Sequence, residues 1–534
     1  MSTVADRIIE QLTMWGIDSV FGVAGDTILP LLDALAAKDA INFYATKHES
    51  SAGFMTSAHT KLNGKPGVCL VHAGPGLANA LNGVADAAND HVPMVVLSGQ
   101  VPRAQIGTDY KQYVDEERLI SPLAVYSAQV TEAQSAIELL KKAFHEAIQR
   151  QGVAHLSLPL DILQSPSQTN LHPPEPYLNT IPESSIDVVL GAIPFLSRIK
   201  KPLILLGKGG RIAAKQVMEL AESWGAGIIL SLGAKGAIAG HHPLVIGGLG
   251  QGGSPVASQL LNSSDGILII GSNWWPKQYV PEQIPIIQID NVPQHIGVNA
   301  PVAYGIVGSS DRILTQLLSD WQPTLRTEWS QEVKTAIANW RKQLDQERRD
   351  PGQPVHPQRL IGDLESVIDP NAIITLDVGD HTVWFNRTFY GERQEILLSG
   401  NWRSMGFGLP AAIQAKISHP DRQVLALVGD GGFAMTQMEF CTAAYFGLNI
   451  MVVVVNNGCL AMEKNRMIVA GLEPNGVNLA NPDFVALAKA CGGDGRKVED
   501  PRELVEAYQW GLKQNGPVLI DVHASAPILP HTTM

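Results

Sequence analysis

Short runs of apolar residues recur along the chain and alternate with helix-length stretches of mixed polarity. Unbroken runs of Val, Ile and Leu are typical of parallel strands that helices cover on both faces. The pattern therefore predicts an α/β fold built from parallel sheets. The clearest expected strands are Gly67–Val71, Pro93–Leu97, Leu203–Leu206, Ile267–Ile270, Ile284–Ile289, Ala372–Leu376, Val424–Val428 and Ile450–Val455.

Two stretches interrupt this alternation. Ser165–Ser184 contains several prolines and no apolar periodicity, and Asp345–Gln358 is charged and then proline-containing. Both compositions are typical of linkers. They divide the chain into three parts, each close to the size of a doubly wound domain. We therefore expect three doubly wound parallel-sheet domains, covering residues 1–165, 185–325 and 355–534.

Composition narrows the choice of partners and compartment. The 534 residues include 39 basic and 51 acidic side chains, a net charge of −12 without a basic cluster, which argues against a nucleic-acid partner. The N-terminus lacks an apolar signal core, and no run approaches the length of a membrane span. The four cysteines lack any CxxC spacing and lie in or beside apolar stretches, so we expect buried thiols in a cytoplasmic protein. They are Cys69, Cys441, Cys459 and Cys491.

The strongest local motif is Gly429-Asp430-Gly431-Gly432, which directly follows an expected strand. Thr436 and Glu439 have the spacing of a capping box, which predicts that a helix starts here. The next expected strand, Ile450–Val455, ends in Asn456-Asn457-Gly458. In an open parallel sheet both motifs would lie at the carboxyl ends of strands, where ligands bind.

The residue types of these two motifs suit a magnesium diphosphate. Asp430 offers a hard oxygen ligand and Asn457 an amide oxygen, and glycines allow the backbone to approach a phosphate closely. Helix N-terminal N–H groups would complete the anion site. Taken singly, Gly-Asp-Gly could be a turn and Asn-Asn-Gly a hairpin. Their occurrence together, each closing an apolar strand, favours the binding site.

With these two motifs the sequence resembles thiamine diphosphate-dependent enzymes, whose signature is GDG followed by NN. It is most similar to the branch of pyruvate oxidase, pyruvate dehydrogenase (quinone) and acetolactate synthase, over nearly the whole chain. The resemblance implies a pyrimidine-binding, a middle and a diphosphate-binding domain. It also implies that Asp430, the Asn457 side chain and the Cys459 carbonyl bind Mg²⁺, with Gly429, Gly431 and Gly432 at the cofactor.

Three further segments match the cofactor-binding parts of this family. Glu49, in Lys47-His48-Glu49-Ser50, matches the carboxylate that exchanges a proton with N1′ of the pyrimidine ring and so activates the cofactor. Met405, before Gly406, matches the bulky residue that bends the cofactor. Asp380 and His381 resemble the segment that contacts the diphosphate. The alternatives are an acidic first-turn residue for Glu49 and a core side chain for Met405.

Three other residues are candidates for the substrate pocket. Asp26, in Gly22-Val23-Ala24-Gly25-Asp26, matches a loop that carries an active-site acid in related decarboxylases, although it could equally be an N-cap. His72 stands where oxidases and synthases have a small or hydroxyl residue, and benzoylformate decarboxylase has a histidine at the comparable place; a structural histidine is the alternative. Gln112 matches a family glutamine, but its neighbours Lys111 and Tyr113 depart from the pattern.

The middle third bears on whether a flavin is bound. Gly207-Lys208-Gly209-Gly210, Gly271-Ser272-Asn273-Trp274-Trp275-Pro276 and Ile287–Asp290 resemble the FAD-binding domain of pyruvate oxidases. Acetolactate synthases keep this domain with or without a working flavin, so FAD stays open. Two features argue against a membrane oxidase. The chain ends at Pro530-His531-Thr532-Thr533-Met534 without an amphipathic tail, and Met462 replaces a phenylalanine that oxidases place between the two cofactors.

The resemblance implies decarboxylation of a pyruvate-like 2-oxo acid, followed by protonation or carboligation. The alternative is a soluble FAD-dependent pyruvate oxidase or dehydrogenase. A non-catalytic cofactor-binding scaffold is a third hypothesis, which Glu49, Asp430 and Asn457 disfavour. Family architecture further implies a homodimer or homotetramer with its active sites at subunit interfaces.

Overall fold

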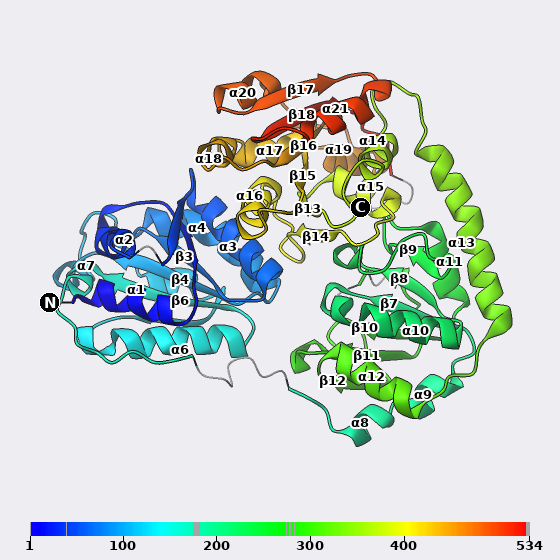
Figure 1. The fold of residues 1–534 in the computed structure, drawn as a ribbon, viewed down its shortest axis with the longest axis horizontal. Coiled ribbons are helices and arrows are strands. Elements are labelled where there is room, and N and C mark those ends of the chain that lie inside the picture. Colours follow the sequence, from blue (N-terminus) through cyan, green and yellow to red (C-terminus); the bar gives the residue numbers. More distant parts are fainter. Residues whose placement is uncertain are drawn as a thin grey trace.

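A computed structural model describes residues 2–38, 40–174, 182–273, 275–276, 279–281 and 283–529. The expectations for Trp274 and for Pro530–Met534 lie outside these residues. The described chain contains three six-stranded sheets in which every pair of named strands is parallel, so the predicted α/β architecture of three doubly wound sheets is confirmed. In Figure 1 the N-terminal sheet lies at the left, the middle sheet at the lower right and the C-terminal sheet at the top.

The N-terminal sheet has the strand order β2-β1-β3-β4-β6-β5. The order reverses between β1 and β3, and this switch point is where ligands bind in doubly wound sheets. Its strands are β1 Ser19–Gly22, β2 Asn42–Ala45, β3 Gly67–Val71, β4 Met94–Gln100, β5 Ala124–Gln129 and β6 Val153–Pro159. Its helices are α1 Val4–Met14, α2 Leu29–Ala36, α3 Glu49–Asn63, α4 Pro75–Asn89, α5 Glu116–Ile120, α6 Ala136–Gln149 and α7 Leu160–Leu163.

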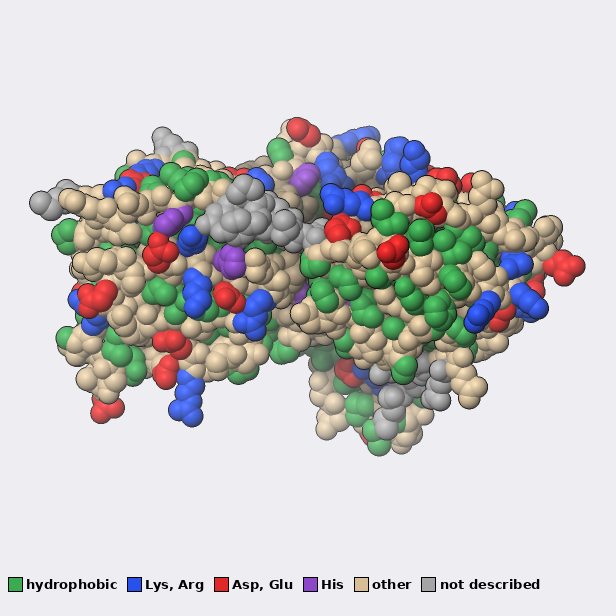
Figure 2. Space-filling model, turned by 90° about the horizontal axis from the view of Figure 1, so that it is seen from below, with side chains coloured by type: hydrophobic (Ala, Val, Ile, Leu, Met, Phe, Trp, Pro, Cys, Tyr) green, Lys and Arg blue, Asp and Glu red, His purple; other side chains and the backbone are tan. Residues whose placement is uncertain are grey.

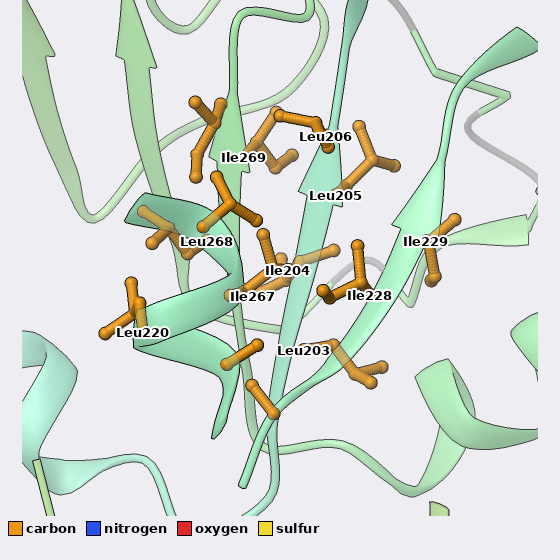
Figure 3. Close-up of a cluster of buried hydrophobic side chains, with 14 of the residues drawn as sticks. Leu203, Ile204, Leu205, Leu206, Leu220, Ile228, Ile229, Ile267, Leu268 and Ile269 are labelled. Atoms are coloured by element: carbon orange, nitrogen blue, oxygen red, sulfur yellow. The ribbon is translucent and has the colours of Figure 1, made fainter. Parts of the chain in front are cut away.

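The middle sheet has the order β12-β11-β10-β7-β8-β9, with its switch point between β7 and β10. Figure 3 shows the branched side chains of β7, β8 and β10 filling the space beside these strands, and the labelled residues are at most 2% exposed. The strands are β7 Pro202–Leu206, β8 Gly227–Leu230, β9 Val245–Gly247, β10 Gly266–Ile270, β11 Ile286–Asp290 and β12 Tyr304–Val307. The helices are α8 Ile186–Leu190, α9 Ile193–Arg198, α10 Ala214–Trp224, α11 Pro255–Ser263, α12 Ser310–Asp320 and α13 Thr327–Glu347.

The C-terminal sheet has the order β14-β13-β15-β16-β18-β17, with its switch point between β13 and β15. Its strands are β13 Ile373–Leu376, β14 Glu395–Leu398, β15 Val424–Gly429, β16 Met451–Asn456, β17 Asp494–Val498 and β18 Val518–His523. Its helices are α14 Pro357–Glu365, α15 Asp380–Thr388, α16 Gly408–Ser418, α17 Asp430–Thr436, α18 Glu439–Tyr445, α19 Ala461–Val469, α20 Phe484–Ala490 and α21 Leu504–Gly511.

The outer domains are joined by direct packing. Helix α16 packs on α3, and one continuous core contains residues of both domains, including Phe54 and Phe407, whose rings meet edge to face at 5.8 Å. Helix α13 runs along the right of Figure 1 from the middle domain to the C-terminal one. The predicted linker at Asp345–Gln358 is shorter than expected. Helix α13 continues to Glu347, so the first residues of the predicted linker are helical. The Glu347 carboxylate lies 2.9 Å from Arg387 of the C-terminal domain.

The surface charges and the cysteines can be compared with what the composition predicts, and the cysteines differ from it in part. Figure 2 shows basic and acidic side chains interspersed on one face of the molecule. Cys69 and Cys459 are buried as expected, but Cys441 and Cys491 are partly exposed, and all four thiols are free. No helix in the described part of the chain has the length and apolar character needed to cross a membrane.

Candidate active site

The two glycine-containing motifs lie side by side at the carboxyl edge of the C-terminal sheet. Gly429 ends β15 and Asp430 begins α17, while Asn456 ends the neighbouring strand β16. The switch point between β13 and β15 opens at the same edge. The hairpin alternative for Asn456-Asn457-Gly458 is wrong, because β16 pairs in parallel with β15 and β18.

The predicted capping box at this helix is wrong. Helix α17 begins at Asp430 with Gly429 as its N-cap and no side-chain cap, and Thr436 is its last residue. The Thr436 hydroxyl donates instead to the Gly406 carbonyl, at 3.2 Å. The Glu439 carboxylate accepts the backbone N–H groups of residues 47 and 48, at 2.9 and 3.2 Å. Both side chains make tertiary contacts that local spacing does not reveal.

The Asp430 carboxylate is 3% exposed and organises the loops around it. Its Oδ2 accepts the Gly458 N–H and the Asn481 side-chain amide, both at 2.8 Å, and its Oδ1 accepts the Gly431 N–H at 3.0 Å. Burial raises the pKa of Asp430, and the hydrogen bond from Asn481 opposes that rise. A cation beside this buried carboxylate would stabilise its charged form. Sequence reasoning missed Asn481, which belongs to no motif.

Asn457 and Cys459 lie in the loop that Asp430 holds. The Asn457 side-chain oxygen accepts the Cys459 N–H at 3.2 Å, and Gly458 adopts a φ of 69° that favours glycine. Among the described residues no group of three or more His, Cys, Asp or Glu side chains could hold a metal ion. Beside the Asp430 carboxylate this loop offers amide and carbonyl oxygens, which are ligands that Mg²⁺ accepts together with phosphate oxygens. The residues present fit a magnesium diphosphate.

Asp377, at the end of β13, was missed by sequence reasoning and joins three segments of this edge. Its carboxylate accepts the Gly406 N–H at 2.9 Å, and a Cβ added to Gly432 would lie 2.8 Å from its Oδ2. Burial raises the pKa of Asp377 to about 6. Met405 is half-buried, which argues against the core alternative, and its Cε lies 3.2 Å from the position of a Cβ on Gly431.

Asp380 and His381 open α15 beside the same glycines. The Asp380 Oδ2 accepts the Trp384 indole N–H at 2.9 Å, and its Oδ1 is buried without a hydrogen-bond partner in the described chain. Burial raises the pKa of Asp380 to about 7 and lowers that of His381 to about 4. A Cβ on Gly429 would lie 3.1 Å from the His381 ring, so the glycine makes room for the imidazole. Met462 is half-buried on α19.

The switch point of the N-terminal sheet brings Asp26 and His72 together. His72 Nδ1 lies 3.2 Å from Asp26 Oδ1 and 2.8 Å from the Thr27 hydroxyl, which in turn accepts the Ala73 N–H. The N-cap alternative for Asp26 is wrong, because Gly25 occupies that position. A carboxylate beside an imidazole, both at the carboxyl edge of the sheet, is an arrangement that can move a proton.

Glu49 is the first residue of α3 and is half-buried. Its Oε2 accepts the Asn79 side-chain amide at 3.1 Å, and its Oε1 lies 3.6 Å from the position of a Cβ on Gly76. Gln112 is exposed with a φ of 62°, and its carbonyl oxygen would collide with a Cβ on Gly74. The structure therefore places Gln112 against the loop that follows His72.

Comparison with known proteins agrees with this arrangement along the chain. Residues 2–119 match the N-terminal TPP binding domain of thiamine pyrophosphate enzymes, residues 189–317 their central domain and residues 377–522 their C-terminal TPP binding domain. The chain belongs to the thiamine pyrophosphate enzyme family. The matched C-terminal segment contains Asp377, Asp430 and Asn457, and the matched N-terminal segment contains Asp26, Glu49 and His72.

Several relatives of this thiamine pyrophosphate enzyme align over nearly its whole length. YdaP of Bacillus subtilis, whose name mentions thiamine pyrophosphate and no reaction, is 32% identical over 99% of this chain and 93% of its own length. An acetolactate synthase of Mycobacterium bovis is 31% identical over 99% of this chain and 89% of its own. A pyruvate oxidase of Lactiplantibacillus plantarum is 28% identical over 96% of this chain and 87% of its own.

The middle domain of this thiamine pyrophosphate enzyme uses its glycines for its own packing. At the switch point the Gly209 N–H donates to the Gly271 carbonyl at 3.0 Å. A Cβ on Gly207 would collide with the same carbonyl, and one on Gly271 with the Gly210 nitrogen. The glycines thus allow the two backbone segments to approach closely at this switch point.

Proposed function

We propose that this thiamine pyrophosphate enzyme decarboxylates a pyruvate-like 2-oxo acid. The remaining fragment is then either protonated or joined to a second carbonyl compound. The observation that carries the proposal is the buried Asp430 carboxylate, which joins the glycine-rich start of α17 to the Asn457 loop. The acetolactate synthases among the relatives support carboligation as the second half of the reaction.

Bound thiamine diphosphate supplies a nucleophilic ring carbon and a sink for the electron pair that decarboxylation leaves behind. Asp430, the Asn457 side chain and the Cys459 carbonyl would hold Mg²⁺, beside the glycines at 429, 431 and 432. Glu49 would exchange a proton with the pyrimidine ring, and Met405 would support the bent cofactor. His72, paired with Asp26, is placed to hold or donate a proton on the substrate side.

A soluble flavin-dependent pyruvate oxidase is the second candidate, since a pyruvate oxidase is among the relatives. One observation weighs against it, which is Met462 in place of the expected phenylalanine. A visible absorption spectrum of the purified protein distinguishes the candidates. We expect a colourless protein, whereas a flavin spectrum that pyruvate bleaches would favour the oxidase.

The active unit in this proposal contains at least two copies of the chain. Large apolar side chains are exposed on helices α17 and α18 and between them: Met435 is 63%, Met438 50% and Tyr445 84% exposed. Large apolar side chains that are exposed in this way are common at protein interfaces. A second copy of this chain is the expected occupant, because the family architecture pairs the first domain of one subunit with the third domain of another.

Calorimetry with thiamine diphosphate and Mg²⁺ tests the binding site without knowledge of the substrate. We expect the wild-type protein to bind, and the Asp430→Asn variant to lose at least tenfold in affinity, about 1.4 kcal/mol or more. The matched control is Asp421→Asn, since Asp421 is exposed in the turn that precedes β15. Equal binding by wild type and Asp430→Asn would contradict the assigned site. Release of CO₂ and formation of acetolactate or acetoin from pyruvate then test the reaction.

A further inference from the structure

A buried carboxyl group of the N-terminal domain has no role in the chemistry proposed above. Glu116, at the start of α5, is 2% exposed, and its Oε2 accepts the hydroxyls of Ser98 and Ser157, both at 2.6 Å. Burial raises the pKa of Glu116 to about 7, although both serines oppose the rise. Burying a carboxyl group costs free energy unless hydrogen bonds compensate for the lost water, so its partners show what holds it in place.

A chain of hydrogen bonds fixes the orientation of Glu116. The Ser98 hydroxyl has one proton and donates it to the carboxylate, so its oxygen accepts the Nε2–H of His155 at 2.8 Å. The other nitrogen, His155 Nδ1, then accepts the Ser127 hydroxyl at 2.8 Å. Burial lowers the pKa of His155 to about 3, which keeps the ring neutral, as this pattern requires. Because each of these side chains has a partner, the network holds the carboxylate rigidly.

The second oxygen of Glu116 reaches the start of α4. Oε1 accepts the N–H of Gly74, at 3.3 Å. Gly74 is the N-cap of α4 with a φ of 58°, and it has no side chain with which to cap the helix. Any Cβ at this position would also collide with the Gln112 carbonyl. The Glu116 side chain thus supplies the hydrogen-bond acceptor for the N-cap N–H of α4 that no side chain of Gly74 could provide.

Helix α4 leads from this anchor to Glu49. Asn79, in the second turn, donates its side-chain amide to Glu49 Oε2 at 3.1 Å. Gly76, in the first turn, lies against the other oxygen of Glu49. The first two turns of α4 therefore contact both oxygens of the Glu49 carboxylate and contribute to its orientation.

We propose that Glu116 is a positioning residue for Glu49: it fixes the start of α4 through Gly74, and α4 orients Glu49 through Asn79. The inference rests on the proposed function, because the orientation of Glu49 matters only if this carboxylate activates thiamine diphosphate. Glu116 itself touches neither the cofactor nor the substrate in this assignment.

Deuterium exchange at C2 of enzyme-bound thiamine diphosphate measures activation without any substrate. We expect Glu116→Gln to slow this exchange about tenfold or more, because a small misplacement of a reacting group has effects of this size. Its calorimetric affinity for thiamine diphosphate and Mg²⁺ should stay at the wild-type value, since Asp430 supplies the metal site. Asn79→Ala should likewise slow the exchange at C2 and leave the affinity for thiamine diphosphate and Mg²⁺ unchanged. The control is Glu117→Gln, the exposed neighbour, which should exchange like wild type.

The double variant Glu116→Gln/Asn79→Ala tests whether the two residues act along one path. We expect it to exchange no more slowly than the slower single variant, because residues of one network are not additive. Multiplied losses, or wild-type exchange in Glu116→Gln, would overturn the inference. If Glu116→Gln does not fold, Ser98→Ala replaces it and should show a smaller loss of exchange. A wild-type protein that neither binds nor exchanges would refute the proposed function itself.

Discussion

The buried carboxyl group of Glu116 should make the stability of the protein depend on pH. Burial raises the pKa of Glu116 from its ordinary value of 4.5 to about 7. Between these two values the folded state holds the proton more firmly than the unfolded state, so this group lowers stability as pH rises from 4.5 to about 7. The contribution is about 3 kcal/mol, an order of magnitude obtained from the shift at 1.36 kcal/mol for each pKa unit.

Comparing wild type with Glu116→Gln isolates this contribution, because glutamine does not titrate. Thermal unfolding at a series of pH values should show the wild type losing stability relative to the variant across the window from 4.5 to about 7, and a constant difference outside it. A difference that is constant across the whole series would contradict the assignment. If the wild type instead gains stability relative to the variant as pH rises, the folded state favours the ionised carboxylate over the protonated acid.

Helices α3 and α4 cross at two glycines, Gly53 and Gly83, which allow the two backbones to approach closely. A Cβ on Gly83 would lie 2.6 Å from the Cα of Gly53 and from the Phe54 nitrogen, which are backbone atoms that cannot turn aside. We expect Gly83→Ala to separate the helices and lower the unfolding free energy by about 1–3 kcal/mol. Since α3 begins with Glu49 and α4 contains Asn79, C2 exchange should slow as well.

The thermal midpoint, followed by circular dichroism, measures the effect of Gly83→Ala. Gly516→Ala is the matched control, because a Cβ there would meet nothing within 4 Å. Equal midpoints for the two variants would mean that the helix crossing tolerates a methyl group.

The sequence predicts elements better than it predicts the contacts between them. The unbroken apolar runs identify strands such as β3, whose bounds agree with the expectation, and the motif at Gly429 marks the edge where the proposed ligand-binding groups lie. Asp377, Asn481 and Glu116 could not be found in this way, because each is a single polar residue whose partners are distant in sequence. The capping box failed for the same reason, since Glu439 reaches across to the other domain.

On the scale of the whole molecule, the proposal assigns the two halves of each active site to different subunits. Glu49 belongs to the first domain and Asp430 to the third, and the exposed apolar side chains beside α17 favour a second copy of the chain as partner. Inactive Glu49→Gln and Asp430→Asn chains should then restore activity when they are mixed, dissociated and reassembled. In each mixed pair one site receives both intact residues and the other receives neither.

Random pairing makes half of the dimers mixed, so the mixture should recover about a quarter of the wild-type activity. The measurement is thiamine diphosphate-dependent release of CO₂ from pyruvate, or C2 exchange if pyruvate is not the substrate. Each variant reassembled alone is the control and should stay inactive. A mixture as inactive as its parents, with mixed dimers verified by mass spectrometry, would place both residues of a site on one chain. The hydrogen bonds from the N–H groups of residues 47 and 48 to Glu439 would then lie within an active site that a single chain forms.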